Sequence, residues 1–442
     1  MKMLLATTAI LSMAAVGTVA NAAAAPASAA ATAVPNNVLL ADWSGPYDGV
    51  PPWDKVDPKL FSPAFEYGIA EQRREIDAIA NNPAAPTFEN TIEALEKTGR
   101  RFSRVENVFA VMTDNKSTPE YQALDKEWQP KISAAFDEIT FNEKLFQRVK
   151  SLYDRKASLG LNAVQDRLLT RTYDGFIKSG ANLNKEQKAQ LASMNQELAT
   201  LFSTFNEHLL ADEGTYITAT EAELKGVPDD VKVALASAAK ERKLPAGTYA
   251  LKNTRSVVDP VLTFASDRAL RQKVWTAFVN RGDNNDANDN NATIARIVKL
   301  RADRARLLGF KNHAEWRMQD TMAKDPAKAM DLMMRVWTPA VARVKEEVAD
   351  QQALANKLGD KITIEPWDYR YYQEKVRKQK YDLSQDEIKP YFALNNLVDG
   401  MFWEAGQLYG LGFKENTGKI PVFDPDVRTF EVTDIPTGKV VG

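Results

Sequence analysis

Two histidines, His208 in FNEHLL and His313 in KNHAEW, are the side chains in this sequence best suited to proton transfer near neutral pH. A zinc site built on histidine usually takes two of them one helical turn apart with a carboxylate nearby, as in the frame H-E-x-x-H. These two lie in distant segments without that frame, and the G-x-S-x-G turn of many serine hydrolases is absent. We therefore favour a helix-end or packing role for both histidines over a chance pairing around a metal ion.

The most polar stretch, RGDNNDANDNNA at residues 281–292, suggests a second chemistry. Its Asp and Asn oxygens suit a hard cation such as calcium, but the EF-hand pattern fails. Counted from Asp286, the sixth position is Asn291 rather than Gly, and the twelfth is Ile297 rather than Glu. Asn and Asp also bond their own backbone in turns and helix caps, so we favour a loop and cap over a cation site.

Residues 365–383, EPWDYRYYQEKVRKQKYDL, carry five aromatic side chains among charged and polar ones. Such a helix can line a substrate groove, or it can be half-buried with its Arg and Lys stems along the apolar surface. The spacing alone favours packing. The methionines at 330–334 are likewise expected in the core. From the residues alone, no catalytic constellation emerges.

Most of the chain is expected to be helical, because apolar residues recur three, four and seven positions apart. Thr87 can cap one helical segment, which carries Phe88, Ile92, Leu95, Phe102, Val105, Phe109 and Met112 on a single face. Asn184 can cap a second helix, and Asp325 followed by Pro326 opens a third that ends near Gly359. Residues 367–381 and 397–409 are predicted to form two more helices.

Strand patterns are few and short. They cover residues 215–220, 248–252 and 421–432. The final stretch, RTFEVTDIPTGKVVG, alternates apolar residues on both sides of a segment with Asp, Pro and Gly, which predicts the start of a β-hairpin. The coarse prediction is a large helical protein with a small sheet.

Composition excludes several classes of protein. The 442 residues are 44% hydrophobic and 26% charged, an ordinary globular balance. The net charge of −2, from 57 basic and 59 acidic residues, gives no support for a nucleic acid or an anionic membrane as partner. Because the chain has no cysteine, it cannot form disulfides, a lipoprotein anchor or thiolate metal sites.

The N-terminus has the pattern of an export signal. Lys2 precedes an apolar run at residues 4–20, and Ala20-Asn21-Ala22 fits the cleavage site. We favour export with cleavage near Ala22 over a retained anchor, since the run is short for a spanning helix. An Ala/Pro-rich leader follows at residues 23–40, and an exported chain without cysteine is expected in a bacterial periplasm.

Several consecutive stretches resemble the thimet-oligopeptidase family of zinc metallopeptidases, most closely its bacterial peptidyl-dipeptidases. They are LTFASDRALRQKVWTAFVNRGDNNDANDN, LRADRARLLGFKNHAEWRMQDTMAKDP, PWDYRYYQEKVRKQKYDL, IKPYFALNNLVDGMFWEAGQLYGLGF and FDPDVRTFEVTD. The resemblance is strong over residues 257–434. Upstream, FSPAFEYGIAEQRREIDAIANNPAAPTFENTIEALE is similar to the family's N-terminal helical region.

The resemblance implies a mainly α, large multi-helix fold of two lobes that flank a deep channel, with a small β-sheet. It implies a metallopeptidase that binds one zinc ion and releases dipeptides from the C-termini of oligopeptides. In the family, an H-E-x-x-H helix and a further downstream Glu hold the zinc, and the Glu of the motif serves as general base. It implies oligopeptides as partners, and we expect a monomer.

No position in 1–442 matches those zinc ligands, the catalytic Glu or the family's substrate-gripping residues. We therefore assign no catalytic or metal-binding residue, and the substrate-binding residues stay unassigned. The chain is expected to be truncated before the zinc-binding helix and inactive alone. Its expected segments are a signal peptide (1–22), the leader (23–40), an N-terminal helical region (41–212) and the first portion of the peptidase domain (245–442). The alternative is a non-catalytic exported protein that binds peptides or acts as a holdase.

Overall fold

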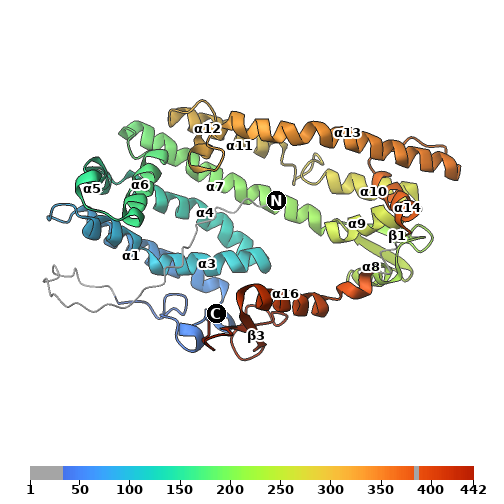
Figure 1. Ribbon diagram of the computed structural model, residues 1–442, viewed down its shortest axis with the longest axis horizontal. Helices are drawn as coiled ribbons and strands as arrows, with labels where there is room; N and C mark the ends of the chain where they lie inside the picture. Colours follow the sequence, from blue (N-terminus) through green and yellow to red (C-terminus); the bar gives the residue numbers. More distant parts are fainter. Residues whose placement is uncertain (1–32, 383–387) are drawn as a thin grey trace.

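The computed structural model describes residues 33–382 and 388–442 and is mainly helical, as predicted (Figure 1). The predicted signal peptide, and the leader as far as residue 32, lie outside the described residues. In the part of the chain that the structure describes, no helix is long and apolar enough to cross a membrane. Two long helices, α7 (Lys185–Gly214) and α13 (Pro326–Leu358), run along the length of the molecule.

The remaining elements follow in chain order. They are α1 (Phe61–Ala80), η4 (Phe88–Glu93), α2 (Ala94–Glu96), α3 (Arg100–Asn115), α4 (Pro119–Phe141), α5 (Glu143–Asp154), α6 (Ala163–Lys178), β1 (Tyr216–Thr220), α8 (Asp229–Glu241), β2 (Thr248–Lys252), α9 (Arg255–Phe264), α10 (Arg268–Val279), α11 (Asn291–Leu307), α12 (His313–Arg317), α14 (Tyr369–Tyr381), α16 (Leu394–Tyr409), β3 (Leu411–Glu415) and β4 (Phe430–Asp434).

The largest core cluster joins α1, α3 and α4. The ring of Phe65 on α1 lies 5.3 Å from that of Phe109 on α3 and 5.0 Å from that of Trp128 on α4, centroid to centroid. Trp128 also donates its indole N–H to Ser62 Oγ on α1, at 2.8 Å. Aromatic pairs at such distances add packing energy beyond their buried area, so these three helices form one rigid unit.

Three of the predicted helix starts are confirmed by their caps. The side chain of Thr87 accepts a hydrogen bond from the backbone of Asn90, and that of Asn184 accepts one from Gln187. Asp325 caps α13 by accepting from Ala327 N at 2.7 Å. These bonds satisfy N–H groups that the first turn of a helix leaves without partners.

The expectation of one helix from Thr87 to Met112 is wrong. A π-helical turn and α2 end near residue 97, and α3 begins at Arg100. Between them Gly99 adopts φ +68°, the left-handed conformation that terminates helices. A Cβ on Gly99 would lie 2.3 Å from Gln72 Nε2, so no other residue fits there without displacing a neighbour. Apolar spacing does not reveal such a break, because the face continues on both sides of it.

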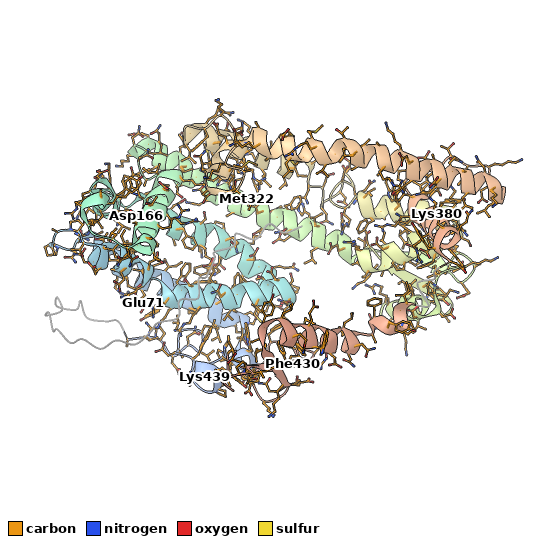
Figure 2. The ribbon with its side chains drawn as sticks, in the orientation of Figure 1. Glu71, Asp166, Met322, Lys380, Phe430 and Lys439 are labelled. Atoms are coloured by element: carbon orange, nitrogen blue, oxygen red, sulfur yellow. The ribbon has the colours of Figure 1, made fainter. Side chains whose placement is uncertain are left out.

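The strands form two small antiparallel sheets. β1 pairs with β2, and β3 pairs with β4. The predicted hairpin at the last residues is present, since Thr433 bridges to Val440 and Asp434 N donates to Lys439 O. Phe430 of β4, labelled in Figure 2, packs edge-on against Phe402 of α16, and the ring centroids are 4.7 Å apart.

The segment around β3 and β4 also contacts the start of the described chain. Tyr47 donates its hydroxyl to Glu431 Oε2 at 2.7 Å and accepts from Asn416 Nδ2 at 2.9 Å. The ring of Trp53 meets that of Phe423, with centroids 5.7 Å apart. Residues near the two ends of the described chain therefore lie side by side (Figure 1).

The expectation that the methionines at 330–334 are in the core is wrong. Met333 is 53% exposed and Trp337, one turn further along α13, is 63% exposed. The helix packs against α14, and its buried residues are Gln351 and Ala355 near its C-terminal end. Along α16, every described residue is at least partly exposed. Two apolar helix surfaces thus have no partner among the described residues.

Candidate functional site

The two histidines lie at opposite ends of α11. His208 Nδ1 is 2.9 Å from Asn290 Oδ1, directly before that helix begins. His313 begins α12 and packs its ring against Trp316, beside Arg304 in the last turn of α11. Fourteen helical residues at 1.5 Å each place Asn290 and Arg304 about 21 Å apart. The two imidazoles therefore cannot share a zinc ion, whose bonds to nitrogen are about 2 Å long.

The family resemblance implies a zinc ion, which needs at least three His, Asp or Glu ligands in a chain without cysteine. Within residues 33–382 and 388–442, no three His, Asp or Glu side chains are placed to hold a metal ion. The described residues do not fit zinc, and no catalytic step can be derived from them.

The polar loop at residues 281–292 folds around its own hydrogen bonds. Asp212 Oδ2 of α7 accepts from Gly282 N at 2.6 Å and from Asn284 Nδ2 at 3.1 Å. Within the loop, Asp289 accepts from the backbone N–H of Asn285 and of Asn291. The favoured interpretation as a loop is confirmed. The cap takes a different form, because the Asn290 side chain bonds His208 and Phe205 O instead of the first turn of α11.

The candidate binding site is a depression between α9, α10, α13 and α14, with a volume of about 650 Å³. Its lining residues are Leu262, Trp275, Val348, Ile364, Glu365, Pro366, Tyr369, Arg370 and Gln373. A few polar groups in a mostly apolar wall is the usual composition of a ligand pocket. The aromatic helix of the sequence analysis, α14, therefore lines this depression on one side and packs into the interior on the other, where Tyr372 is buried.

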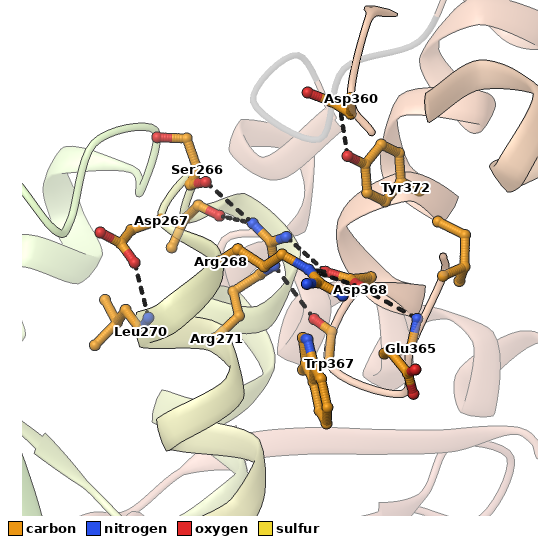
Figure 3. A network of polar contacts seen from close by, with 12 residues as sticks. Ser266, Asp267, Arg268, Leu270, Arg271, Asp360, Glu365, Trp367, Asp368 and Tyr372 are labelled. Atoms are coloured by element: carbon orange, nitrogen blue, oxygen red, sulfur yellow. Dashed lines mark hydrogen bonds and ion pairs between the residues drawn. The ribbon is translucent and has the colours of Figure 1, made fainter. Parts of the chain in front are cut away.

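A buried ion-pair network fixes the geometry of this depression (Figure 3). Asp368, which is 0% exposed, accepts from Arg271 NH2 at 2.8 Å and from Arg268 NH2 at 2.8 Å. Arg271 uses its other donors on the backbone oxygens of Ala265, Ser266 and Trp367. The network thus connects the start of α10 to the loop before α14, and both elements form walls of the depression.

Electrostatics support this arrangement. Burial opposes ionisation of Asp368, but hydrogen bonds from Arg268 and Arg271 outweigh it and hold the pKa of the carboxyl below its ordinary value. Tyr372 donates its hydroxyl to Asp360 Oδ2 at 2.7 Å, and burial is the main cause that raises the pKa of that phenol. Asp368 is therefore a fixed charge of the scaffold rather than a group available for proton transfer.

The depression can bind but does not contain a nucleophile and base pair. Tyr369 donates its hydroxyl to Glu347 at 2.9 Å, and Arg370 pairs with Asp259 at 3.1 Å. Among the described residues, the Glu365 carboxylate has no ion-pair partner. The walls therefore suit an apolar side chain that carries a cationic end toward Glu365.

Sequence reasoning found the aromatic helix but missed the network behind it. The available signal was the pair Arg268 and Arg271, three residues apart after the Asp267 cap, opposite a lone Asp in PWDYR. The spacing shows that the two arginines share a helix face. It does not reveal which of the chain's many carboxylates they meet.

Comparison with known proteins shows which family part of the chain matches. Residues 261–442 match the family described as peptidase family M3. The resemblance to thimet-oligopeptidase-like metallopeptidases is thus confirmed, and the chain is a relative of the M3 peptidases.

Curated relatives refine this assignment. The chain is 38% identical to the dipeptidyl carboxypeptidase of Escherichia coli over 87% of its own length and 56% of that protein's. It is 38% identical to the dipeptidyl carboxypeptidase of Salmonella typhimurium over 90% of its length and 58% of that protein's. The oligopeptidase A of Escherichia coli is 28% identical over 87% of this chain and 57% of its own length. The chain therefore spans little more than half the length of these relatives.

Proposed function

We propose that the protein is a zinc-dependent peptidase that releases dipeptides from the C-termini of oligopeptides. This proposal rests on the difference in sequence identity to two relatives, each of which aligns with the same share of this chain. Over 87% of the chain in each case, identity is 38% to a dipeptidyl carboxypeptidase and 28% to an oligopeptidase A.

The described residues serve this function as a scaffold. The depression beside α14 can receive an apolar side chain of a peptide, and the network around Asp368 keeps its walls in place. The exposed apolar surfaces of α13 and α16 suit packing against further polypeptide, which the longer relatives possess. A zinc ion would have to be held outside the described residues, and it would supply there an activated water for peptide-bond hydrolysis.

A two-arm assay tests the proposal. In one arm, the 442-residue chain is given zinc and an N-blocked tetrapeptide. In the other, it is first co-purified with the segment that follows the aligned part of the Escherichia coli dipeptidyl carboxypeptidase. We expect cleavage in the second arm alone, with a free dipeptide detected by mass spectrometry and lost on chelation.

Three other outcomes of this assay would contradict the proposal or part of it. Release of single residues or of internal fragments would contradict the dipeptide specificity. Zinc-dependent cleavage by the chain alone would contradict its dependence on further polypeptide. Micromolar peptide binding without cleavage in either arm would replace the proposal with a non-catalytic peptide-binding protein.

We further propose that the protein is exported to the periplasm, because the first 22 residues have the n-region, apolar run and cleavage site of a signal peptide. Expression in a bacterium with an intact secretion system is expected to give a mature N-terminus at Ala23 in the periplasmic fraction. Lys2→Glu in the n-region is expected to slow this processing. N-terminal sequencing checks both, and an uncleaved N-terminus in the cytoplasmic fraction would contradict export.

A further inference from the structure

Three arginines gather at the junction of α11 and α12 without a carboxylate partner. Arg304 lies over the ring of Trp316 at 4.6 Å from its centroid, and Arg317 lies over the same ring at 5.5 Å. Arg301, one turn before Arg304, lies over Phe202 of α7 at 5.1 Å. Within residues 33–382 and 388–442, none of the three forms an ion pair. Most other arginines of this chain do, so the cluster carries uncompensated positive charge.

The nearest acid does not neutralise it. Asp137 of α4 is separated from Arg304 by the amide of Asn195, which donates to Asp137 Oδ1 at 2.8 Å and accepts from Arg304 NH1 at 3.0 Å. Burial raises the pKa of Asp137 to about 6, so the carboxyl is still mostly ionised at pH 7. Because it bonds the amide of Asn195 instead of a guanidinium, it forms no ion pair with Arg304.

Polar atoms inside the cluster also lack partners. Arg301 Nε, Arg304 Nε and His313 Nδ1 are buried without a hydrogen bond to any described residue. Burial lowers the pKa of His313 to about 4, with the charges of the three arginines as further causes. His313 is therefore neutral at pH 7 and adds no charge. Because the three arginines affect its pKa, an anion bound among them would change the electrostatic environment of its imidazole.

We propose that Arg301, Arg304 and Arg317 form a binding site for a dianion of the phosphate class. Several guanidinium groups match the tetrahedral oxygens of such an anion by parallel N–H···O bonds, and a doubly charged anion gains more from three cations than a single carboxylate does. Arg317 is exposed and Arg301 and Arg304 are half-buried, so an anion reaches the cluster from solvent. The site is separate from the depression beside α14 and does not depend on the peptidase proposal.

The chain carries its own reporter for this site. It has two histidines, so selectively labelled protein gives two imidazole NMR signals, and His208, at the far end of α11, is the internal control. At about pH 7.5, where most inorganic phosphate is the dianion, its addition is expected to shift the His313 signal in a saturable way, because a bound anion changes the electrostatic potential at the imidazole. The His208 signal is expected to stay in place. A parallel arm with a soluble phosphomonoester distinguishes free phosphate from an esterified group.

Variants complete the test. Arg317→Gln, at an exposed position, is expected to weaken phosphate binding about tenfold or more, since it removes a charge-assisted hydrogen bond to the anion. Arg301→Gln is expected to do the same. Arg306→Gln on the same helix is the matched control, because Arg306 pairs with Asp303, and it should leave the affinity unchanged.

Three results would overturn the proposal. They are an unmoved His313 signal with both anions, an equal shift with chloride at the same ionic strength, and phosphate binding that Arg301→Gln and Arg317→Gln both leave intact. Circular dichroism of each variant shows that it has folded, so a loss of binding cannot arise from unfolding.

Discussion

Replacing Asp368 with asparagine is expected to lower the free energy of unfolding by about 3–5 kcal/mol, because it leaves the buried guanidinium of Arg271 without a counter-charge. Arg271 is 2% exposed, so water cannot take the place of the carboxylate. Its remaining bonds go to backbone oxygens, which hold the side chain in position but do not balance its charge. Urea denaturation followed by tryptophan fluorescence measures the change.

The matched control is Asp331→Asn on the exposed part of α13. Asp331 pairs with Arg335, and both side chains are more than two-thirds exposed. Such a surface pair contributes about 0.2–1 kcal/mol, so the same substitution there should cost under about 1 kcal/mol. If the two variants lose equal stability, the Asp368 network is not what holds α10 to α14.

The same network predicts how stability depends on pH. The pKa of Asp368 is lower in the folded state than its ordinary value of about 3.9. A carboxyl with a lowered folded-state pKa contributes stability that is fully present above its unfolded pKa and is lost as pH falls through the folded value. Between pH 7 and 5 this contribution is constant. Below about pH 4 the original chain is expected to lose stability faster than Asp368→Asn does.

Although the whole protein is expected to be a monomer, the 442-residue chain is expected to self-associate through the apolar surface of α13. Replacing Met333 by lysine and Trp337 by glutamate together is expected to make it monomeric. Both residues are exposed on α13, where apolar side chains have no partner among the described residues. Contiguous exposed apolar surface drives association of soluble proteins, and charges at its centre oppose it. Analytical ultracentrifugation of the 442-residue chain at micromolar concentration measures the change. The free energy of unfolding should change by under about 0.5 kcal/mol, because surface substitutions remove little packing.

Val164→Glu provides the control for that experiment. Val164 is a strongly exposed apolar residue on α6, distant in sequence from α13. An isolated apolar residue at a surface is ordinary and should not affect association. A chain that is already monomeric before any substitution, or one that associates as strongly after the α13 changes, would show that this surface is not a docking face.

Local signals in the sequence were sufficient to predict where three of the helices begin. Thr87, Asn184 and Asp325 each lie directly before an apolar periodic run, and each side chain caps the helix as expected. A cap is decided by residues two or three positions apart, so the sequence contains all the information that is needed. Residues 248–252 likewise form β2 as predicted.

The sequence was insufficient to predict features that depend on contacts between distant parts of the chain. The apolar spacing of α13 predicts a face that prefers burial, but burial also needs a second surface to cover it, and spacing says nothing about that surface. The Asp368 network could not be predicted from the sequence for a related reason, because it joins residues about a hundred positions apart. The sequence showed which family the chain resembles, whereas the geometry of the depression beside α14 came from the structure.

The contact between Tyr47 and Glu431 has a consequence for biosynthesis. These residues are 384 positions apart in the chain. A ribosome that adds roughly 5–20 residues per second needs about 20–80 s to pass from one to the other. During that interval the segment around Tyr47 has emerged while the strand that will pair with it has not yet been made. The hydrogen bonds of Tyr47 to Glu431 and Asn416 can therefore form only after the segment that contains β4 has been made.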